Sequence, residues 1–227
     1  MLFPGLGARV AAIRARIDAA AKRGGHGQNV TIVAVTKTHG PEAIAAAHAA
    51  GLEDVGENRV QEALAKMPLV TEPVRWHLIG HLQRNKVKSV DSFSLFHALD
   101  SSRLADAINR YGEERQRAVD VLMQVNPARE ETKGGFDLHE VEEVAKRLKS
   151  MNGLRVRGAM TVARLGADET ELRETFAAVR ETRRILADAA HPATELSMGM
   201  SNDFEIAVEE GATMVRLGSI LFGARDR

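Results

Sequence analysis

The chain has 227 residues, of which 44% are hydrophobic, and its 31 Lys and Arg residues balance its 31 Asp and Glu residues. This length suits one large domain or two small ones, and the charge balance argues against a nucleic-acid-binding or polybasic membrane-binding protein. The sequence contains no cysteine, which excludes disulfides, thiolate catalysis and zinc–thiolate sites. The N-terminus lacks the pattern of a signal peptide, and no apolar run approaches the ~18 residues that span a bilayer. We therefore expect a cytoplasmic globular protein.

The predicted elements follow a regular rhythm. A helix is expected over residues 5–22, and eight strand-like apolar runs then alternate with runs of helical spacing. The predicted strands cover residues 30–37, 53–57, 74–80, 94–100, 119–126, 154–162, 193–199 and 213–219. Polar clusters at residues 100–102 and 201–203 mark helix starts, and Gly51 and Gly211 mark helix ends.

This alternation predicts an α/β fold with a parallel sheet and crossover helices. Eight such units in about 200 residues match a small (β/α)8 TIM-like barrel, here with an extra N-terminal helix. A doubly wound open sheet is the competing architecture, but no G-x-G-x-x-G follows the first strand. We find no linker or low-complexity tract, so residues 1–227 are expected to form a single domain. No heptad repeat or long exposed apolar edge is evident, and a monomer is expected.

In a parallel barrel, functional groups gather where the strands end. The residues that end the predicted strands are therefore candidates for one shared rim. They are Lys37, Glu57, Asn58, His81, Met160, Thr161, Ser197, Arg216 and Ser219.

Lys37 ends the first predicted strand, on the same alternating face as Val33 and Val35. If these valines point into the barrel, the amine lies at an apolar mouth, where partial desolvation favours its neutral, nucleophilic form. This is the condition for forming a Schiff base with a carbonyl. The alternative is a lysine that ends the strand and extends into water.

Two stretches point to a phosphate. Ser197 lies where the seventh strand meets a helix start, and Gly218-Ser219 follows the eighth strand. In barrels, the loops after strands seven and eight often hold a phosphate with backbone N–H groups. Glycine permits close approach, and the two serine hydroxyls can donate hydrogen bonds. Ordinary turn chemistry is the alternative.

Arg216 lies on the eighth predicted strand between Val215 and Leu217. These apolar neighbours leave little room for an exposed side chain, which favours a role in the site. The alternative is a surface ion pair with Glu209 or Glu210.

A metal site is not expected. Asp54, Glu57, His77 and His81 are the residues that such a site would use. No H-x-x-x-H helix or tight carboxylate cluster supports one.

A Schiff-base lysine, a phosphate cradle and an inward arginine at one barrel mouth indicate a phosphorylated aldehyde as ligand. The chain also resembles the YggS/PROSC family, the pyridoxal 5′-phosphate homeostasis proteins. The resemblance spans nearly the whole chain in family order, and its SMGMS segment is highly specific. The matching stretches are VAVTKT (33–38), GENRVQEAL (56–64), WHLIGHLQRNK (76–86), LRVRGAMT (154–161), ELSMGMSNDFEIAVEEGATMVRLGS (195–219) and LFGAR (221–225).

The resemblance implies a barrel like the N-terminal domain of alanine racemase, with pyridoxal 5′-phosphate bound as an internal aldimine and a role in controlling its free level. The implied cofactor-binding residues are Lys37 for the aldimine, Arg216 for the pyridine nitrogen, Ser197, Gly218 and Ser219 for the phosphate, and Asn58 and His81 along the site.

Three positions depart from the family pattern. The family often has serine at Thr36, lysine at His39 and threonine at Ser219. Ser219 keeps the hydroxyl, so the phosphate prediction survives. His39 removes a positive charge near the mouth, which puts any role of that position toward an anionic partner in doubt.

A carrier of pyridoxal phosphate competes with an amino-acid racemase or related enzyme; a Schiff-base aldolase acting on a sugar phosphate is a remote third class. Two-base racemisation needs an acid/base group on each face of the cofactor. The one tyrosine, Tyr111, is far in sequence from any predicted strand end, and the chain ends at Arg227 soon after the eighth strand. Arg216, a pure donor, leaves the ring nitrogen unprotonated. We expect a carrier without substantial catalytic activity, with client enzymes that depend on the cofactor as partners, and with His81 as the one candidate for the missing base.

Overall fold

The computed structural model describes residues 3–128, 130 and 133–223. The last two residues of the LFGAR stretch, 224 and 225, lie outside the described residues.

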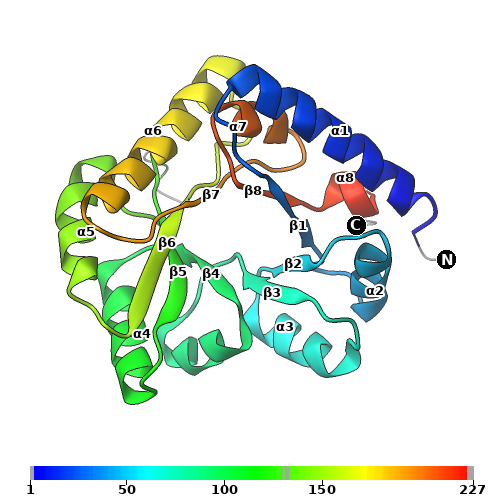
Figure 1. Ribbon diagram of the computed structural model, residues 1–227. Helices are drawn as coiled ribbons and strands as arrows, with labels where there is room; N and C mark the ends of the chain where they lie inside the picture. Colours follow the sequence, from blue (N-terminus) through cyan, green and yellow to red (C-terminus); the bar gives the residue numbers. More distant parts are fainter. Residues whose placement is uncertain (1–2, 129, 131–132, 224–227) are drawn as a thin grey trace.

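Eight parallel strands pair in chain order, and β8 pairs with β1, so the sheet closes into a barrel (Figure 1). The strands are β1 Thr31–Val35, β2 Asp54–Glu57, β3 Arg75–Leu78, β4 Leu95–Leu99, β5 Val119–Gln124, β6 Leu154–Met160, β7 Glu195–Ser197 and β8 Met214–Leu217. Each lies within its predicted run. The predicted (β/α)8 barrel is confirmed, and closure excludes the open doubly wound sheet.

Helices surround the barrel and connect the strands (Figure 1). The α-helices are α1 Leu6–Gly24, α2 Pro41–Ala49, α3 Val60–Lys66, α4 Ser102–Glu114, α5 Val141–Lys149, α6 Glu169–Asp188, α7 Phe204–Glu209 and α8 Ser219–Phe222. Short 3-10 helices cover Met67–Leu69, Arg84–Ser92 and Leu138–Glu140.

The connection from β3 to β4 differs from the expected α-helix, because the 3-10 helix Arg84–Ser92 takes its place. Its buried residues, Val87 and Val90, are three positions apart. A 3-10 helix places positions i and i+3 on the same side, so this spacing buries both valines against the barrel.

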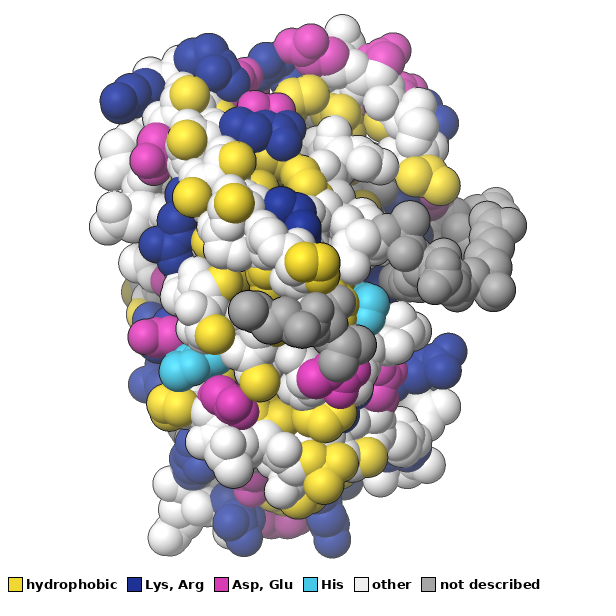
Figure 2. Space-filling view, turned by 90° about the vertical axis from the view of Figure 1, so that its right-hand side faces the viewer, with side chains coloured by type: hydrophobic (Ala, Val, Ile, Leu, Met, Phe, Trp, Pro, Cys, Tyr) yellow, Lys and Arg dark blue, Asp and Glu magenta, His cyan; other side chains and the backbone are white. Residues whose placement is uncertain are grey.

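The predicted N-terminal helix is confirmed as α1, which lies against α7 and α8 outside the barrel (Figure 1). Val10, Ile13 and Ile17 recur at helical spacing and are buried. At its outer edge Arg16 pairs with Glu205 of α7. Figure 2 shows Lys and Arg side chains interspersed with Asp and Glu on the face that carries this helix. Within the described part of the chain, no helix is long and apolar enough to cross a membrane.

Candidate functional site

A cavity of about 1160 Å³ opens at the C-terminal ends of the strands. Residues that end or follow each of the eight strands line it. Six of the seven residues predicted to bind the cofactor are on its wall: Lys37, Asn58, His81, Arg216, Gly218 and Ser219. The seventh, Ser197, lies beneath it.

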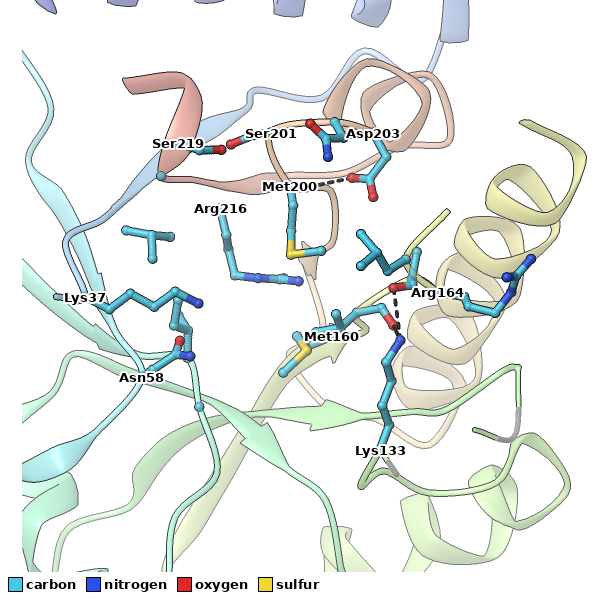
Figure 3. A pocket seen from close by; sticks show the side chains of 18 of the residues that line it. Lys37, Asn58, Lys133, Met160, Arg164, Met200, Ser201, Asp203, Arg216 and Ser219 are labelled. Carbon is cyan, nitrogen blue, oxygen red and sulfur yellow. Dashed lines mark hydrogen bonds between the residues drawn. The ribbon is translucent and has the colours of Figure 1, made fainter. Parts of the chain in front are cut away.

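Lys37 follows β1 in a turn, and its half-buried side chain points into the cavity (Figure 3). Val35 lines the same cavity, as the strand alternation predicts. The flanking Thr36 is fully buried and faces the other way, where its hydroxyl donates to Glu57. Thr38 adopts a positive φ of 69°, which is unusual for a residue other than glycine. Such strain persists where neighbouring groups hold the backbone in place.

A buried cluster holds the backbone on both sides of Lys37. Oε1 of Glu57 accepts from Oγ1 of Thr36 (2.7 Å) and from Nζ of Lys66 (2.8 Å). Nζ of Lys66 also donates to the Thr36 carbonyl (2.9 Å) and to Glu62 (2.8 Å), and Glu62 accepts from the backbone N–H that follows Lys37. We call Thr36, Glu57, Glu62 and Lys66 the loop clamp.

Glu57 was a candidate for the rim but faces the helix layer and is fully buried. Burial raises the pKa of its carboxyl, and the hydrogen bonds from Lys66 and Thr36 oppose this effect. Its function is therefore to hold the loop, because its side chain does not reach the cavity wall.

Arg216 is 5% exposed, and its guanidinium points to the centre of the cavity (Figure 3). Nη1 donates to the carbonyl (2.7 Å) and hydroxyl (2.6 Å) of Ser197, and Nη2 donates to the carbonyl of Thr161 (2.7 Å). Burial lowers its pKa to about 10, against the opposing charge of Asp203, so the group stays cationic at neutral pH. An inward arginine is observed in place of the alternative surface ion pair.

Ser197 ends β7 and is fully buried, and its hydroxyl is engaged by Arg216 and His97. Ser201, the second serine of SMGMS, lines the cavity instead, together with Ser219 (Figure 3). The N–H of Ile220 lies 3.4 Å from Oγ of Ser201, which joins the loop after β7 to the loop after β8. Of the two serines in SMGMS, only Ser201 lies beyond the end of β7. Its place in the loop that follows the strand is the feature of the sequence that could have indicated a cavity residue.

The wall beside these serines has room for an anionic group. Gly218 has a φ of −126° and a ψ of −76°, and the nearest atoms that a Cβ on it would meet belong to Val35, at 3.4 Å or more. No neighbouring atom of the protein crowds this position, so the wall leaves space for a ligand to approach the backbone. With the hydroxyls of Ser201 and Ser219 and the cation of Arg216 nearby, the residues fit a phosphate.

Asn58 lies deep in the site, and His81 lies at its rim. Asn58 is half-buried beneath Lys37 (Figure 3), and its carbonyl would lie 2.3 Å from a Cβ on Gly80, so β2 and β3 approach closely here. The side chain of His81 is 67% exposed at the rim, and its Nδ1 lies 2.8 Å from Oδ2 of Asp100.

Met160, a rim candidate, is on the wall, and sequence reasoning did not assign other wall residues to the site, including Met200, Asp100 and Lys133. Nζ of Lys133 donates to the carbonyl of Ala163 (3.0 Å) across the cavity from Lys37 (Figure 3). Among the described residues, no three His, Asp or Glu side chains form a metal-binding group.

The chain matches the family model "Alanine racemase, N-terminal domain" over residues 9–226. A pyridoxal phosphate homeostasis protein of Aquifex aeolicus is 39% identical over 221 residues, covering 96% of this chain and 97% of the relative. The structure of PipY from Synechococcus elongatus with PLP bound has a TM-score of 0.85 and 35% identity, covering 96% of this chain and 100% of that chain.

A more distant structure shares the fold alone. Alanine racemase from Corynebacterium glutamicum is 16% identical, with a TM-score of 0.72, and the match covers 92% of this chain and 61% of that one. The family model and the relative that is 39% identical both match nearly the whole chain. They show that the chain belongs to the family of pyridoxal phosphate homeostasis proteins, on the fold of the alanine racemase N-terminal domain.

Proposed function

We propose that the protein binds pyridoxal 5′-phosphate in this cavity, holds it through Lys37 and acts in pyridoxal phosphate homeostasis. The observation that carries this proposal is the convergence of the Lys37 amine and the Arg216 guanidinium on one cavity (Figure 3), whose wall also includes Gly218. The relatives named pyridoxal phosphate homeostasis proteins and the structure of PipY with PLP bound support it.

When bound, pyridoxal phosphate supplies an aldehyde that condenses with a lysine amine to a Schiff base. The loop clamp fixes the backbone around Lys37, so that the amine stays at the mouth of the barrel. The hydroxyls of Ser201 and Ser219 donate to the phosphate, and Gly218 lets it approach the backbone. Arg216 donates to the ring nitrogen.

Ser197 positions Arg216 in this proposal and does not bind the phosphate. Its hydroxyl holds Arg216, and Ser201 takes the phosphate-binding role predicted for it. Asn58 and His81 border the ligand below and above.

Two features favour a carrier over the alternative, an amino-acid racemase or related enzyme. The cation of Arg216 offers only donors to the ring nitrogen, so the nitrogen stays unprotonated and the ring is a weak electron sink. Tyr111 is not among the described residues of the wall, because its hydroxyl lies on the outside of the barrel beside Asp91. We propose a cytoplasmic monomer that exchanges its ligand with enzymes dependent on pyridoxal phosphate.

The test is an absorption spectrum of the purified protein before and after borohydride reduction. We expect a visible band that reduction removes, with the mass of the cofactor then fixed on the peptide that carries Lys37. Lys37→Ala should abolish the band and leave the fold intact. Lys133→Ala is the matched control, since Lys133 is a second lysine on the cavity wall. A band that survives in Lys37→Ala and disappears in Lys133→Ala would refute the assignment.

A further inference from the structure

A chain of hydrogen-bonded side chains crosses the barrel interior beneath the cavity. Nη1 of Arg216 donates to Oγ of Ser197 (2.6 Å), and this oxygen lies 2.8 Å from Nδ1 of His97. Nε2 of His97 lies 2.8 Å from Nδ1 of His77, and Nε2 of His77 lies 2.8 Å from Oδ1 of Asp54. We call these five side chains the buried relay.

The relay connects the cavity to the opposite end of the barrel. Its members come from β2, β3, β4, β7 and β8, and β4 and β7 are not neighbours in the closed sheet, so the contact between His97 and Ser197 spans the interior. None of the five residues is more than 6% exposed. Asp54, the first residue of β2, forms two hydrogen bonds with Arg75, the first residue of β3 (2.8 and 2.6 Å).

A polar interior is unusual for this fold, because the centre of a parallel barrel is normally filled by branched apolar side chains. A buried polar group without a partner destabilises the protein. Here every link has a partner at hydrogen-bonding distance. The loss of one member therefore leaves a neighbouring polar group without its hydrogen bond. Through these successive hydrogen bonds Asp54, at the far end, is connected to Arg216.

The donor direction along the relay depends on the protonation of Asp54 and His97. Burial alone would raise the pKa of Asp54, but hydrogen bonds from His77 and Arg75 outweigh it and lower the pKa to about 2, so Asp54 is a carboxylate that only accepts. Burial foremost, and then the nearby His77 ring and Arg216 guanidinium, hold the pKa of His97 well below its usual range, so the His97 ring is neutral.

If each ring carries one proton, a single order of donors and acceptors satisfies every link. Nε2 of His77 donates to Asp54, Nε2 of His97 donates to His77, and the hydroxyl of Ser197 donates to His97. The Ser197 oxygen then presents its lone pairs to Arg216, which can only donate.

We propose that Asp54, His77 and His97 are positioning residues that fix the guanidinium of Arg216 for contact with the ring nitrogen of pyridoxal phosphate. This inference rests on the proposed function and deepens it. Asp54 acts from the far end of the barrel, because its carboxylate sets the hydrogen-bond direction that reaches Arg216. The simpler explanation is that the relay only stabilises the barrel, in which case its loss would weaken all ligands alike.

The test compares two near-isosteric variants of the full chain. Asp54→Asn removes the carboxylate that sets the donor order. Asp120→Asn is the matched control, because Asp120 of β5 forms a two-bond pair with Arg155 of β6 in the same register but makes no contact with a histidine. Dissociation constants are measured for pyridoxal 5′-phosphate and for 1-deazapyridoxal 5′-phosphate, which carries C–H in place of the ring nitrogen.

We expect the preference of the protein for the ligand with the ring nitrogen to fall about 3- to 10-fold in Asp54→Asn, the range of one hydrogen bond to a charged or polar group. The absorption maximum of bound pyridoxal phosphate should shift in the same variant. Asp120→Asn should leave both the preference and the maximum unchanged. If Asp54→Asn weakens the two ligands by the same factor, the relay has only a structural role and the proposal is overturned.

A second variant approaches the relay from its centre. His97→Phe removes both ring nitrogens and should lower the preference at least as much as Asp54→Asn. If His97→Phe does not fold, Asp54→Asn still decides the question, since its side chain keeps the shape of aspartate. A wild-type protein that binds neither ligand would overturn the proposed function itself, a result distinct from equal weakening in a variant.

Discussion

Two glycines in the loops after β7 and β8 serve different purposes that the sequence does not distinguish. Gly199 has a φ of +92°, and a Cβ on it would lie 2.6 Å from Cβ of Ala207, so the fold requires glycine there. Gly218 has neither constraint and faces the cavity. Both match family motifs, but only the backbone geometry shows that the fold requires glycine at Gly199 and leaves open space beside Gly218.

The two serines of SMGMS show the same limit. Ser197 was predicted to bind phosphate because it ends a strand. Its side chain still points into the barrel interior, where it is fully buried below the mouth. Ser201 lies on the loop beyond, where backbone and hydroxyl face the cavity. The sequence prediction named Ser197 and did not consider Ser201, because the position at which β7 ends could not be fixed to the residue without the structure.

These placements predict different ligand selectivities for two alanine variants. Ser201→Ala should weaken binding of pyridoxal phosphate by on the order of 1 kcal/mol, the value of one hydrogen bond, and leave pyridoxal binding unchanged. Ser197→Ala should weaken both ligands together, because it loosens Arg216 and not the phosphate contact. Titration of each variant with both ligands checks this. A loss confined to pyridoxal phosphate in Ser197→Ala would restore Ser197 as the phosphate ligand.

At the scale of elements, most of the predicted strands extend past the observed ends, and β1 is the case that bears on the site. The alternating apolar pattern continues to Lys37, but strand pairing ends at Val35 and the chain turns. The loop clamp explains why the turn is still well defined. Its acidic and basic residues come from β2 and α3, more than twenty positions after Thr36. No local pattern in the first strand could therefore predict them.

The loop clamp predicts that Lys66, which does not line the cavity, contributes strongly to the stability of the protein. Lys66→Met should lower the free energy of unfolding by about 3–5 kcal/mol, because it leaves the buried carboxylate of Glu57 without its cation. The double variant Lys66→Met with Glu57→Gln should recover part of this loss. Urea denaturation measures both.

Arg147→Met is the control for this experiment. It breaks the exposed ion pair with Asp106 and should change stability by no more than about 1 kcal/mol. Equal effects of Lys66→Met and Arg147→Met would mean that the clamp is not a buried ion pair in solution.

At the scale of the molecule, the barrel could be predicted because its signal is repetitive. Eight strand-like runs alternate with helices, and each run contains the strand that the structure shows. The buried relay could not be predicted, because barrel closure and not sequence proximity brings His97 to Ser197, 100 positions away. In the sequence, His77 and His97 are isolated histidines in apolar strands, and the former was considered only as a metal ligand.

The arrangement of the whole barrel predicts that the loaded protein is a poor catalyst of amino-acid chemistry. Incubated with L-alanine in deuterated water, it should exchange the α-proton at a rate near that of free pyridoxal phosphate. A positioned general base contributes roughly 10²–10⁴-fold, and Tyr111 lies outside the barrel while His81 lies at the exposed rim beside Asp100. Arg216 further keeps the ring a weak electron sink. Proton exchange followed by NMR decides the matter, with Lys37→Ala as the blank. Rapid exchange that requires Lys37 would establish an enzyme, and loss of that exchange in His81→Ala would identify His81 as its base.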